Sequence, residues 1–267
     1  MINHFNYQDL VTCYYDNQHQ DKPALVFIHG LGENLSSWKH QLNYFAKDYR
    51  VIAMDLRGHG QTNDGIRPIS IKQYAVDVLT LLDQLKVFSA NFVGLSMGGM
   101  IIQELTKHHQ DRMLSIALCN TAAYPADGGK ISITDRLNFI HNLSLEGMAE
   151  YVARKCLARN TSQAIYAQAL DIFRQNRLMP YLAATTAAFT IDFRQDLSSI
   201  YVPTLIIVGE FDVVTPIASA QFLHQHIANS KLVIIPDAGH LTKLEQPAQF
   251  NQVLKSFLLK LRSTINS

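Results

Sequence analysis

The chain has 267 residues, of which 48% are hydrophobic and 17% are charged, and its formal net charge is +1 at pH 7. This size fits one large domain with a substantial core, and the small net charge gives no electrostatic reason to expect nucleic acid or an anionic membrane surface as a partner. No apolar run reaches the roughly 20 residues that a membrane span needs.

Apolar runs bounded by turn residues predict the strands of a sheet. Two short antiparallel edge strands are expected over residues 5–7 and 11–15. Buried strands are expected over residues 24–28, 50–54, 90–93, 113–118, 204–208 and 231–235. Helices alternate with these strands, over residues 70–85, 97–108 and about 247–261, and another begins at Thr215-Pro216, with the threonine as its cap. The alternation predicts an α/β fold with a mostly parallel sheet covered on both faces.

Residues 121–201 interrupt this alternation, because they contain no convincing strand. Four successive helices are expected there, over residues 132–143, 145–157, 162–174 and 179–189. We therefore divide the single domain into a core, made of residues 1–120 and 202–267, and a helical insertion, made of residues 121–201.

The segment Gly94-Leu95-Ser96-Met97-Gly98 places a serine in a tight turn between a predicted strand and a predicted helix. Glycine on both sides tolerates the crowding of such a turn, and the hydroxyl is left exposed at its tip. Glycine-rich turns around a serine occur by chance in many loops. The strand–turn–helix context nevertheless predicts that Ser96 is a catalytic nucleophile.

A nucleophile of this type needs an acid and a histidine, in that order along the chain. Asp212 and His240 each come just after a predicted strand, where an open α/β sheet presents its ligand crevice. Two other acids are near them: we expect Glu210 to support its loop or face solvent, and Asp237 to shape the turn before the histidine. The predicted catalytic triad is Ser96, Asp212 and His240.

The turn His29-Gly30-Leu31-Gly32 follows the first buried strand. Its glycines let the backbone turn sharply, so that an amide can face the tip of the serine turn. We predict that the backbone N–H groups of Leu31 and Met97 form an oxyanion hole, while their side chains shape the pocket.

The other histidines and acids near the predicted site have structural explanations. His29 is expected to support the oxyanion turn and His59 to make a structural hydrogen bond, while Asp55 is expected to hold the loop that follows it through backbone N–H groups. His224 and His226 have a weak metal-ligand spacing without a supporting carboxylate or cysteine cluster. We therefore expect neither a metal nor a cofactor.

The three cysteines, Cys13, Cys119 and Cys156, are odd in number and unclustered. The first residues lack the basic start and apolar core of a signal peptide. Both features favour a cytoplasmic protein with reduced thiols. Cys119 lies in an apolar run, so we expect a core residue there rather than a second nucleophile.

Together these motifs resemble the α/β-hydrolase superfamily, close in pattern to its carboxylesterase and 3-oxoadipate enol-lactonase-like branch. The matching segments are His29-Gly30-Leu31-Gly32, Asp55-Leu56-Arg57-Gly58-His59-Gly60, Gly94-Leu95-Ser96-Met97-Gly98-Gly99, Gly209-Glu210-Phe211-Asp212 and Gly239-His240. The resemblance spans roughly residues 24–258. It implies the α/β-hydrolase fold, with an eight-stranded sheet and with the helical insertion as a lid, and it places the acid of the triad at Asp212.

The resemblance also implies an enzyme that hydrolyses carboxylic esters or lactones of small molecules through an acyl-enzyme, with 3-oxoadipate enol-lactone as one candidate substrate. The residues expected to bind substrate are Gly30, Phe139, Leu143, Phe189 and Val213. Arg136 and Arg154 could each meet a substrate carboxylate, although surface arginines are the commoner explanation.

Other functions stay open at this point. A thioesterase, an acyltransferase or a cofactor-free lyase could use the same triad, and some plant hormone receptors of the superfamily bind a ligand in a hydrolase pocket. One fold carries many chemistries, so the motifs do not name the substrate. The protein is expected to be a monomer or a homodimer.

Overall fold

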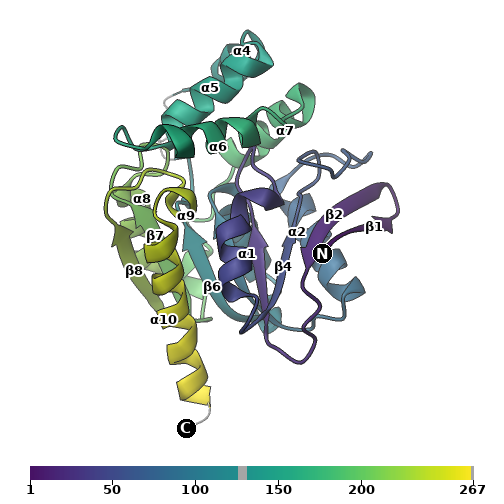
Figure 1. Ribbon diagram of the computed structural model, residues 1–267, viewed down its shortest axis with the longest axis vertical. Coiled ribbons are helices and arrows are strands. Elements are labelled where there is room, and N and C mark those ends of the chain that lie inside the picture. Colours follow the sequence, from purple (N-terminus) through teal and green to yellow (C-terminus); the bar gives the residue numbers. More distant parts are fainter. Residues whose placement is uncertain (126–130, 266–267) are drawn as a thin grey trace.

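The computed structural model describes residues 1–125 and 131–265. The described residues contain one eight-stranded sheet, with the strand order β1-β2-β4-β3-β5-β6-β7-β8 (Figure 1). The strands are β1 (Ile2–Tyr7), β2 (Leu10–Asp16), β3 (Ala24–Ile28), β4 (Arg50–Met54), β5 (Ala90–Leu95), β6 (Met113–Cys119), β7 (Thr204–Gly209) and β8 (Ser230–Ile235). Strand β2 pairs antiparallel with β1 and β4, and all later neighbours pair parallel. The predicted α/β fold is confirmed, and β1 and β2 are both longer than predicted. The prediction that both are edge strands is wrong for β2, because it pairs with β4 as well as with β1.

Strand β3 illustrates how the sheet is built. All five of its residues are buried. Ala24, Val26 and Ile28 pack into the core on one face of the sheet, and Leu25 and Phe27 pack into the core on the other. Successive side chains of a strand point to opposite faces, so a strand covered on both faces needs an uninterrupted apolar run.

Helices cover both faces of the sheet (Figure 1). The face that bears Phe27 is covered by α1 (Lys39–Phe45), α9 (Thr242–Glu245) and α10 (Pro247–Ile265). The opposite face is covered by α2 (Ile71–Gln84), α3 (Met97–Thr106) and α8 (Ile217–His226). Short 3₁₀ turns occur at η1 (Leu35–Trp38), η2 (Gln110–Arg112) and η3 (Leu197–Ser199).

One predicted helix cap is wrong. Helix α8 begins at Ile217, and its N-cap, Pro216, has no side-chain capping bond. The hydroxyl of Thr215 donates instead to the carboxylate of Asp212, 2.9 Å away. An N-cap side chain accepts a backbone N–H of the first helical turn. Thr215 lies one residue before the N-cap, and its side chain is directed to the buried carboxylate instead.

Four helices lie between β6 and β7: α4 (Ile133–His141), α5 (Leu145–Cys156), α6 (Gln163–Phe173) and α7 (Leu178–Phe189). Figure 1 shows them gathered at one end of the sheet. The side chains of Ser132, Ser144 and Ser162 cap the first three, each by accepting a backbone N–H from three residues ahead. No strand occurs among the described residues of this segment, as predicted.

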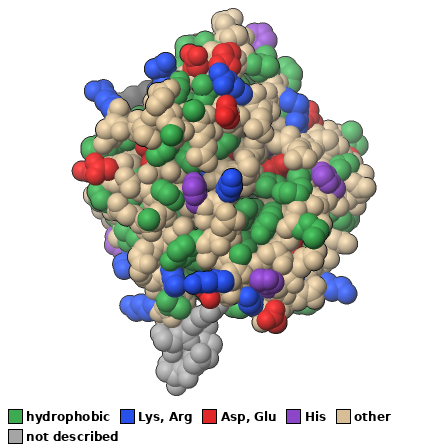
Figure 2. Space-filling view, viewed as in Figure 1, with side chains coloured by type: hydrophobic (Ala, Val, Ile, Leu, Met, Phe, Trp, Pro, Cys, Tyr) green, Lys and Arg blue, Asp and Glu red, His purple; other side chains and the backbone are tan. Residues whose placement is uncertain are grey.

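Charges of both signs are interspersed over the face shown in Figure 2, in keeping with the formal net charge of +1. Among the described helices, none combines the length and the apolar character that a membrane crossing requires.

Candidate active site

Ser96 lies at the turn between β5 and α3, with φ 54° and ψ −115°, a conformation that serine rarely adopts. The two glycines of the motif make the turn possible. A Cβ on Gly94 would collide with the carbonyl of Gly98, and a Cβ on Gly98 would collide with the carbonyl oxygen of Ile28 in the neighbouring strand β3. The side chain of Ser96 is half-buried and borders a cavity.

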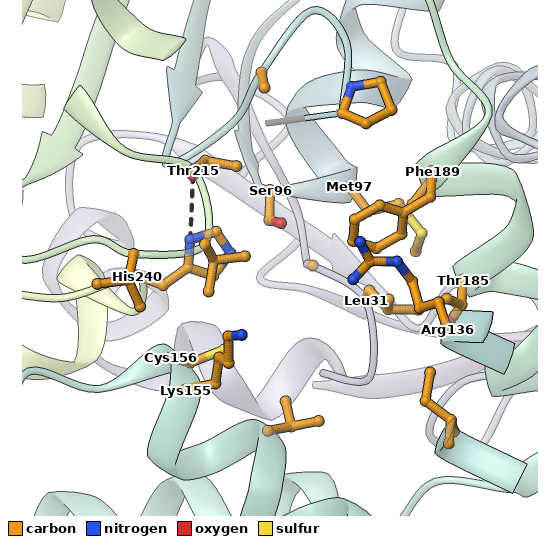
Figure 3. Close-up of a pocket in the computed structure, with 18 of the residues that line it drawn as sticks. Leu31, Ser96, Met97, Arg136, Lys155, Cys156, Thr185, Phe189, Thr215 and His240 are labelled. Atoms are coloured by element: carbon orange, nitrogen blue, oxygen red, sulfur yellow. Dashed lines mark hydrogen bonds between the residues drawn. The ribbon is translucent and has the colours of Figure 1, made fainter. Parts of the chain in front are cut away.

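Asp212 and His240 follow β7 and β8, and their side chains meet in the structure. Nδ1 of His240 lies 2.8 Å from Oδ2 of Asp212. Both residues are buried, and His240 borders the same cavity as Ser96. With Nδ1 at the carboxylate, Nε2 is the ring nitrogen left for a second partner. Figure 3 draws Ser96 between His240 on one side and Met97 and Leu31 on the other.

Four further donors hold the carboxylate of Asp212. Oδ1 accepts the backbone N–H groups of Val214 and Thr215, at 2.8 and 2.9 Å. Oδ2 accepts the Thr215 hydroxyl and the amide of Asn120, both at 2.9 Å. Burial alone would raise the pKa of Asp212, but the attraction of His240 and these hydrogen bonds outweigh it and lower the pKa. Asp212 is therefore ionised and fixed in direction.

Asn120 and Thr215 were missed as site residues in the sequence analysis. Asn120 follows β6 with φ 45°, and its amide also donates to the carbonyl of Gly239, 3.2 Å away. It therefore links the loop of Asp212 with the loop of His240. An asparagine or aspartate with positive φ at a strand end is visible only once the backbone is known, so the sequence carried no signal for it.

The turn His29-Gly30-Leu31-Gly32, which we name the oxyanion turn after its predicted role, is held by the side chain of His29. Leu56 donates its backbone N–H to Nε2 of His29, 3.0 Å away, so the ring proton sits on Nδ1 and is donated to the carbonyl of Gly30, 2.8 Å away. Burial lowers the pKa of His29 to about 3, which keeps the ring neutral in this tautomer. The predicted supporting role of His29 is confirmed.

The N–H of Leu31 belongs to the same peptide group as the Gly30 carbonyl. In a trans peptide these two groups point in opposite directions, so the bond from His29 fixes the direction of the N–H. Neither this N–H nor that of Met97, the first residue of α3, donates to another backbone carbonyl in the described residues. Leu31 and Met97 border the same cavity as Ser96, so these two N–H groups are the candidates for the predicted oxyanion hole.

A cavity of about 580 Å³ lies between the serine turn and helices α4–α7. This volume is in the range of small-molecule sites. Gly30, Phe139, Phe189 and Val213 line the cavity, as predicted for substrate-binding residues. Leu143 is absent from its lining. It follows the end of α4 and packs against a small apolar cluster made of Ile140, Met148 and Tyr181.

Two cationic side chains, Arg136 and Lys155, also line the cavity (Figure 3). The guanidinium of Arg136 lies over the ring of Phe189, 3.8 Å from its centroid. Arg154, the other arginine considered from the sequence, is exposed and lies near the ring of Tyr166, outside the cavity lining.

Asp55, Glu210 and Cys119 have structural surroundings. The carboxylate of Asp55 accepts the backbone N–H groups of Leu35 and Gln61, so the role predicted for it is confirmed. Glu210 accepts the backbone N–H of Asp237, which has φ 53° in the turn before His240. Cys119 is fully buried, and burial raises the pKa of its thiol.

The histidines proposed as a weak metal pattern are engaged elsewhere. His224 pairs with the hydroxyl of Ser230, and His226 with the carbonyl of Phe222, both at 2.8 Å. In the described ranges, no group of three or more histidine, cysteine or acidic side chains is placed to hold a metal ion. His59 is buried with Nδ1 at the carbonyl of Arg57, and burial lowers its pKa to about 3.

Known proteins are similar to this chain in both sequence and fold. The family described as alpha/beta hydrolase fold matches residues 23–247. The chain is 34% identical to 3-oxoadipate enol-lactonase 2 of Acinetobacter baylyi over 254 residues, which is 94% of each chain. It resembles the crystal structure of the enol-lactonase from Burkholderia xenovorans LB400, with a TM-score of 0.89 and 30% identity, over 96% of this chain and 100% of that one.

A third similar structure is Est816, described as an N-acyl homoserine lactone degrading enzyme. Its TM-score is 0.84 at 29% identity, over 96% of this chain and 100% of that one. The match to the family covers more than half of the chain, and the matched range includes the serine turn and the loops of Asp212 and His240. The chain therefore belongs to the α/β-hydrolase fold family, in its enol-lactonase-like branch.

Proposed function

We propose that this protein is a serine hydrolase that cleaves carboxylic esters or lactones of small molecules through an acyl-enzyme on Ser96. Its family and branch make it a hydrolase of this class. The observation that carries the proposed mechanism is the 2.8 Å contact between His240 Nδ1 and Asp212 Oδ2, beside a cavity that Ser96 also lines. This arrangement has the parts of a Ser-His-Asp triad.

In the first step, Oγ of Ser96 attacks the carbonyl carbon while Nε2 of His240 takes its proton. Asp212 stabilises the imidazolium and keeps the ring oriented. The N–H groups of Leu31 and Met97 donate to the oxyanion of the tetrahedral intermediate. Loss of one such donor typically costs about 3–4 kcal/mol in the barrier.

The intermediate collapses as the bond to the leaving oxygen breaks, and His240 gives its proton to that oxygen. In a lactone, the leaving hydroxyl stays attached to the acyl group. A water molecule then attacks the acyl-enzyme while His240 takes one of its protons. Collapse of the second intermediate returns that proton to Ser96 and releases the carboxylic acid.

Hydrolysis of p-nitrophenyl acetate, butyrate and octanoate by wild type and by Ser96→Ala tests the proposal. We expect the variant to lose at least about 10³-fold in kcat, and the chain-length preference of wild type to report the size of the cavity. Ser199→Ala, which makes the same substitution at an exposed serine in η3, is the control and should keep wild-type activity. Turnover that survives Ser96→Ala would overturn the assignment.

Within this class, we propose a lactone or ester that carries a carboxylate. The support is Arg136 on the cavity wall, together with relatives that are named 3-oxoadipate enol-lactonases. Arg136→Met should lower kcat/KM for mono-p-nitrophenyl succinate about tenfold or more, because a charge-assisted hydrogen bond contributes about 1.5–3 kcal/mol. For the neutral p-nitrophenyl butyrate, kcat/KM should change less than about twofold, because this ester has no carboxylate for the guanidinium to bind. Arg154→Met is the matched control, and an equal loss on both esters would contradict carboxylate recognition.

We also propose that α4–α7 act as a lid over the site. The support is that Phe139, Tyr151, Tyr181 and Phe189, from three of these helices, line the cavity that Ser96 borders. Phe189→Ala should widen the preference toward longer acyl chains, because it removes a large side chain from the wall. An unchanged chain-length profile would count against this role.

A further inference from the structure

A buried ion pair lies beside the oxyanion turn. Nζ of Lys243 donates to Oε1 of Glu33 at 2.7 Å, and the two side chains are 0% and 2% exposed. Glu33 directly follows the oxyanion turn, whereas Lys243 lies in α9, three residues after His240. The pair therefore joins the oxyanion turn to the segment that carries His240, and the proposed mechanism needs a fixed distance between these two segments.

Glu33 holds Gly30 by both of its backbone groups. Oε2 of Glu33 accepts the N–H of Gly30 at 2.8 Å, and the N–H of Glu33 donates to the carbonyl of Gly30 at 3.1 Å. The same carbonyl accepts from His29. This carbonyl and the N–H of Leu31 form one planar peptide group, so the bonds to the carbonyl fix the proposed oxyanion donor directly. The N–H of Gly30 belongs to the preceding peptide, so the bond to Oε2 of Glu33 fixes the other side of Gly30.

Lys243 in turn fixes the carboxylate of Glu33. Its ammonium also donates to the carbonyl of Ser37 at 3.1 Å and lies 4.5 Å from the centre of the Trp38 ring. These contacts hold both ends of the pair. From the same helix, Glu245 accepts the N–H of Gly239, the residue before His240, at 2.9 Å. Helix α9 is thus bound to both loops.

Stability alone does not explain such a pair. Apolar residues of similar volume are often as stable as a buried ion pair or more so, because both charges must leave water. Glu33 also lines the cavity, together with Leu31 and Met97, whose N–H groups are the proposed oxyanion donors. An uncompensated carboxylate there would oppose that negative charge, and Lys243 neutralises it.

We propose that the Glu33–Lys243 ion pair positions the Gly30–Leu31 peptide, so that the Leu31 N–H meets the oxyanion in the transition state. The inference rests on the proposed function of Ser96. Neither side chain touches the reacting atoms, so both are positioning residues. Misalignment of one donor should weaken the transition state more than the bound substrate.

The test replaces both charges at once, in Glu33→Leu/Lys243→Met, so that no unpaired charge is left buried. We expect kcat to fall about 10- to 100-fold with KM within about twofold, less than the 10²–10³-fold typical of complete loss of a donor. An aryl trifluoromethyl ketone forms a tetrahedral oxyanion adduct with the serine, and its inhibition constant should rise by the same factor as kcat/KM falls. A residue that acts only on folding would leave both values unchanged in the folded fraction.

The chain offers a matched control in Asp16 and Arg50, whose side chains are 3% and 9% exposed. This carboxylate also accepts a backbone N–H, that of Gln18, and the guanidinium also donates to a backbone carbonyl, that of Leu85. Arg50 begins β4, at the end of the strand opposite to the site. Asp16→Leu/Arg50→Met should therefore change the melting temperature but not kcat.

A second variant covers the case in which the double variant does not fold. Glu33→Asp keeps the charge but is one methylene shorter, so it cannot reach Gly30 and Lys243 together, and its kcat should also fall with KM unchanged. Wild-type kcat in either folded variant, or an equal fall in the control, would overturn the inference. If wild type itself shows no Ser96-dependent turnover, the proposed function fails instead.

Discussion

The strained backbone conformation of Ser96 predicts that a glycine at this position raises stability and abolishes activity. Its φ of 54° and ψ of −115° are accessible to glycine and strained for any residue with a Cβ. Ser96→Gly should therefore relax the turn and abolish hydrolysis. Ser96→Ala should abolish hydrolysis equally but keep the strain, because it retains the Cβ.

The size of the effect follows from two opposing contributions. Strain at such a position costs about 1–3 kcal/mol, whereas the greater freedom of glycine in the unfolded chain costs about 0.4–1 kcal/mol relative to alanine. The glycine variant should exceed the alanine variant by about 1 kcal/mol in free energy of unfolding. For a chain of this size that corresponds to a melting temperature about 2–4 °C higher.

The assay is thermal unfolding of both variants beside wild type, with urea unfolding for the free energies. Lys86→Gly is a matched control outside the site, since Lys86 also has a φ of 54°. It should be stabilised without loss of hydrolysis. A glycine variant at position 96 that is no more stable than the alanine variant, while Lys86→Gly gains stability, would refute the claim that Ser96 stores strain.

Three further changes test other parts of the structure. Thr215→Val removes a hydrogen bond to Asp212, which contributes about 0.5–1.5 kcal/mol, so kcat should fall about two- to tenfold in steady-state assays. The folded pKa of His59 is about 3 and its usual pKa is 6.5, so between these values only the unfolded chain takes up a proton there. The free energy of unfolding should therefore decrease as the pH is lowered below 6.5, by up to about 1.4 kcal/mol per pH unit. Urea unfolding of His59→Phe between pH 6.5 and 5 should show a correspondingly smaller slope, and an unchanged slope would contradict this. Gly98→Ala should cost about 1–3 kcal/mol and most of the activity, because its Cβ meets the Ile28 carbonyl; a fully active, equally stable variant would refute the close packing.

The sequence was sufficient where a short segment determines its own structure. The glycines around Ser96 are needed because of contacts within four residues and with one neighbouring strand, so their spacing is visible in any single chain. The apolar run at residues 24–28 reports burial on both faces for the same reason. The serine caps of α4, α5 and α6 are likewise local, and these helices lie close to the predicted positions.

The sequence was insufficient where a role depends on which segments meet. Glu33 and Lys243 are 210 residues apart, and a lysine after His240 gives no sign of a buried carboxylate partner. Thr215 has a good capping sequence, yet α8 begins one residue later than predicted and the Thr215 side chain is directed to Asp212. Leu143 lies just beyond the C-cap of α4, where the helical period no longer sets the direction of a side chain. It packs against a cluster that borders the cavity without lining the cavity itself.

The residues proposed for catalysis and the residues that shape the cavity lie on different elements of the fold. The residues proposed for bond cleavage follow β3, β5, β7 and β8, whose pairing in one sheet fixes their relative positions. The side chains that shape the far wall of the cavity come from α4–α7, which pack largely on one another through the pairs α5–α6 and α4–α7. Substitutions on those helices can therefore change the shape and charge of the cavity without moving a strand end. Two solved structures of about 30% identity share the fold while their names record different lactones, as one fold with variable cavity walls allows.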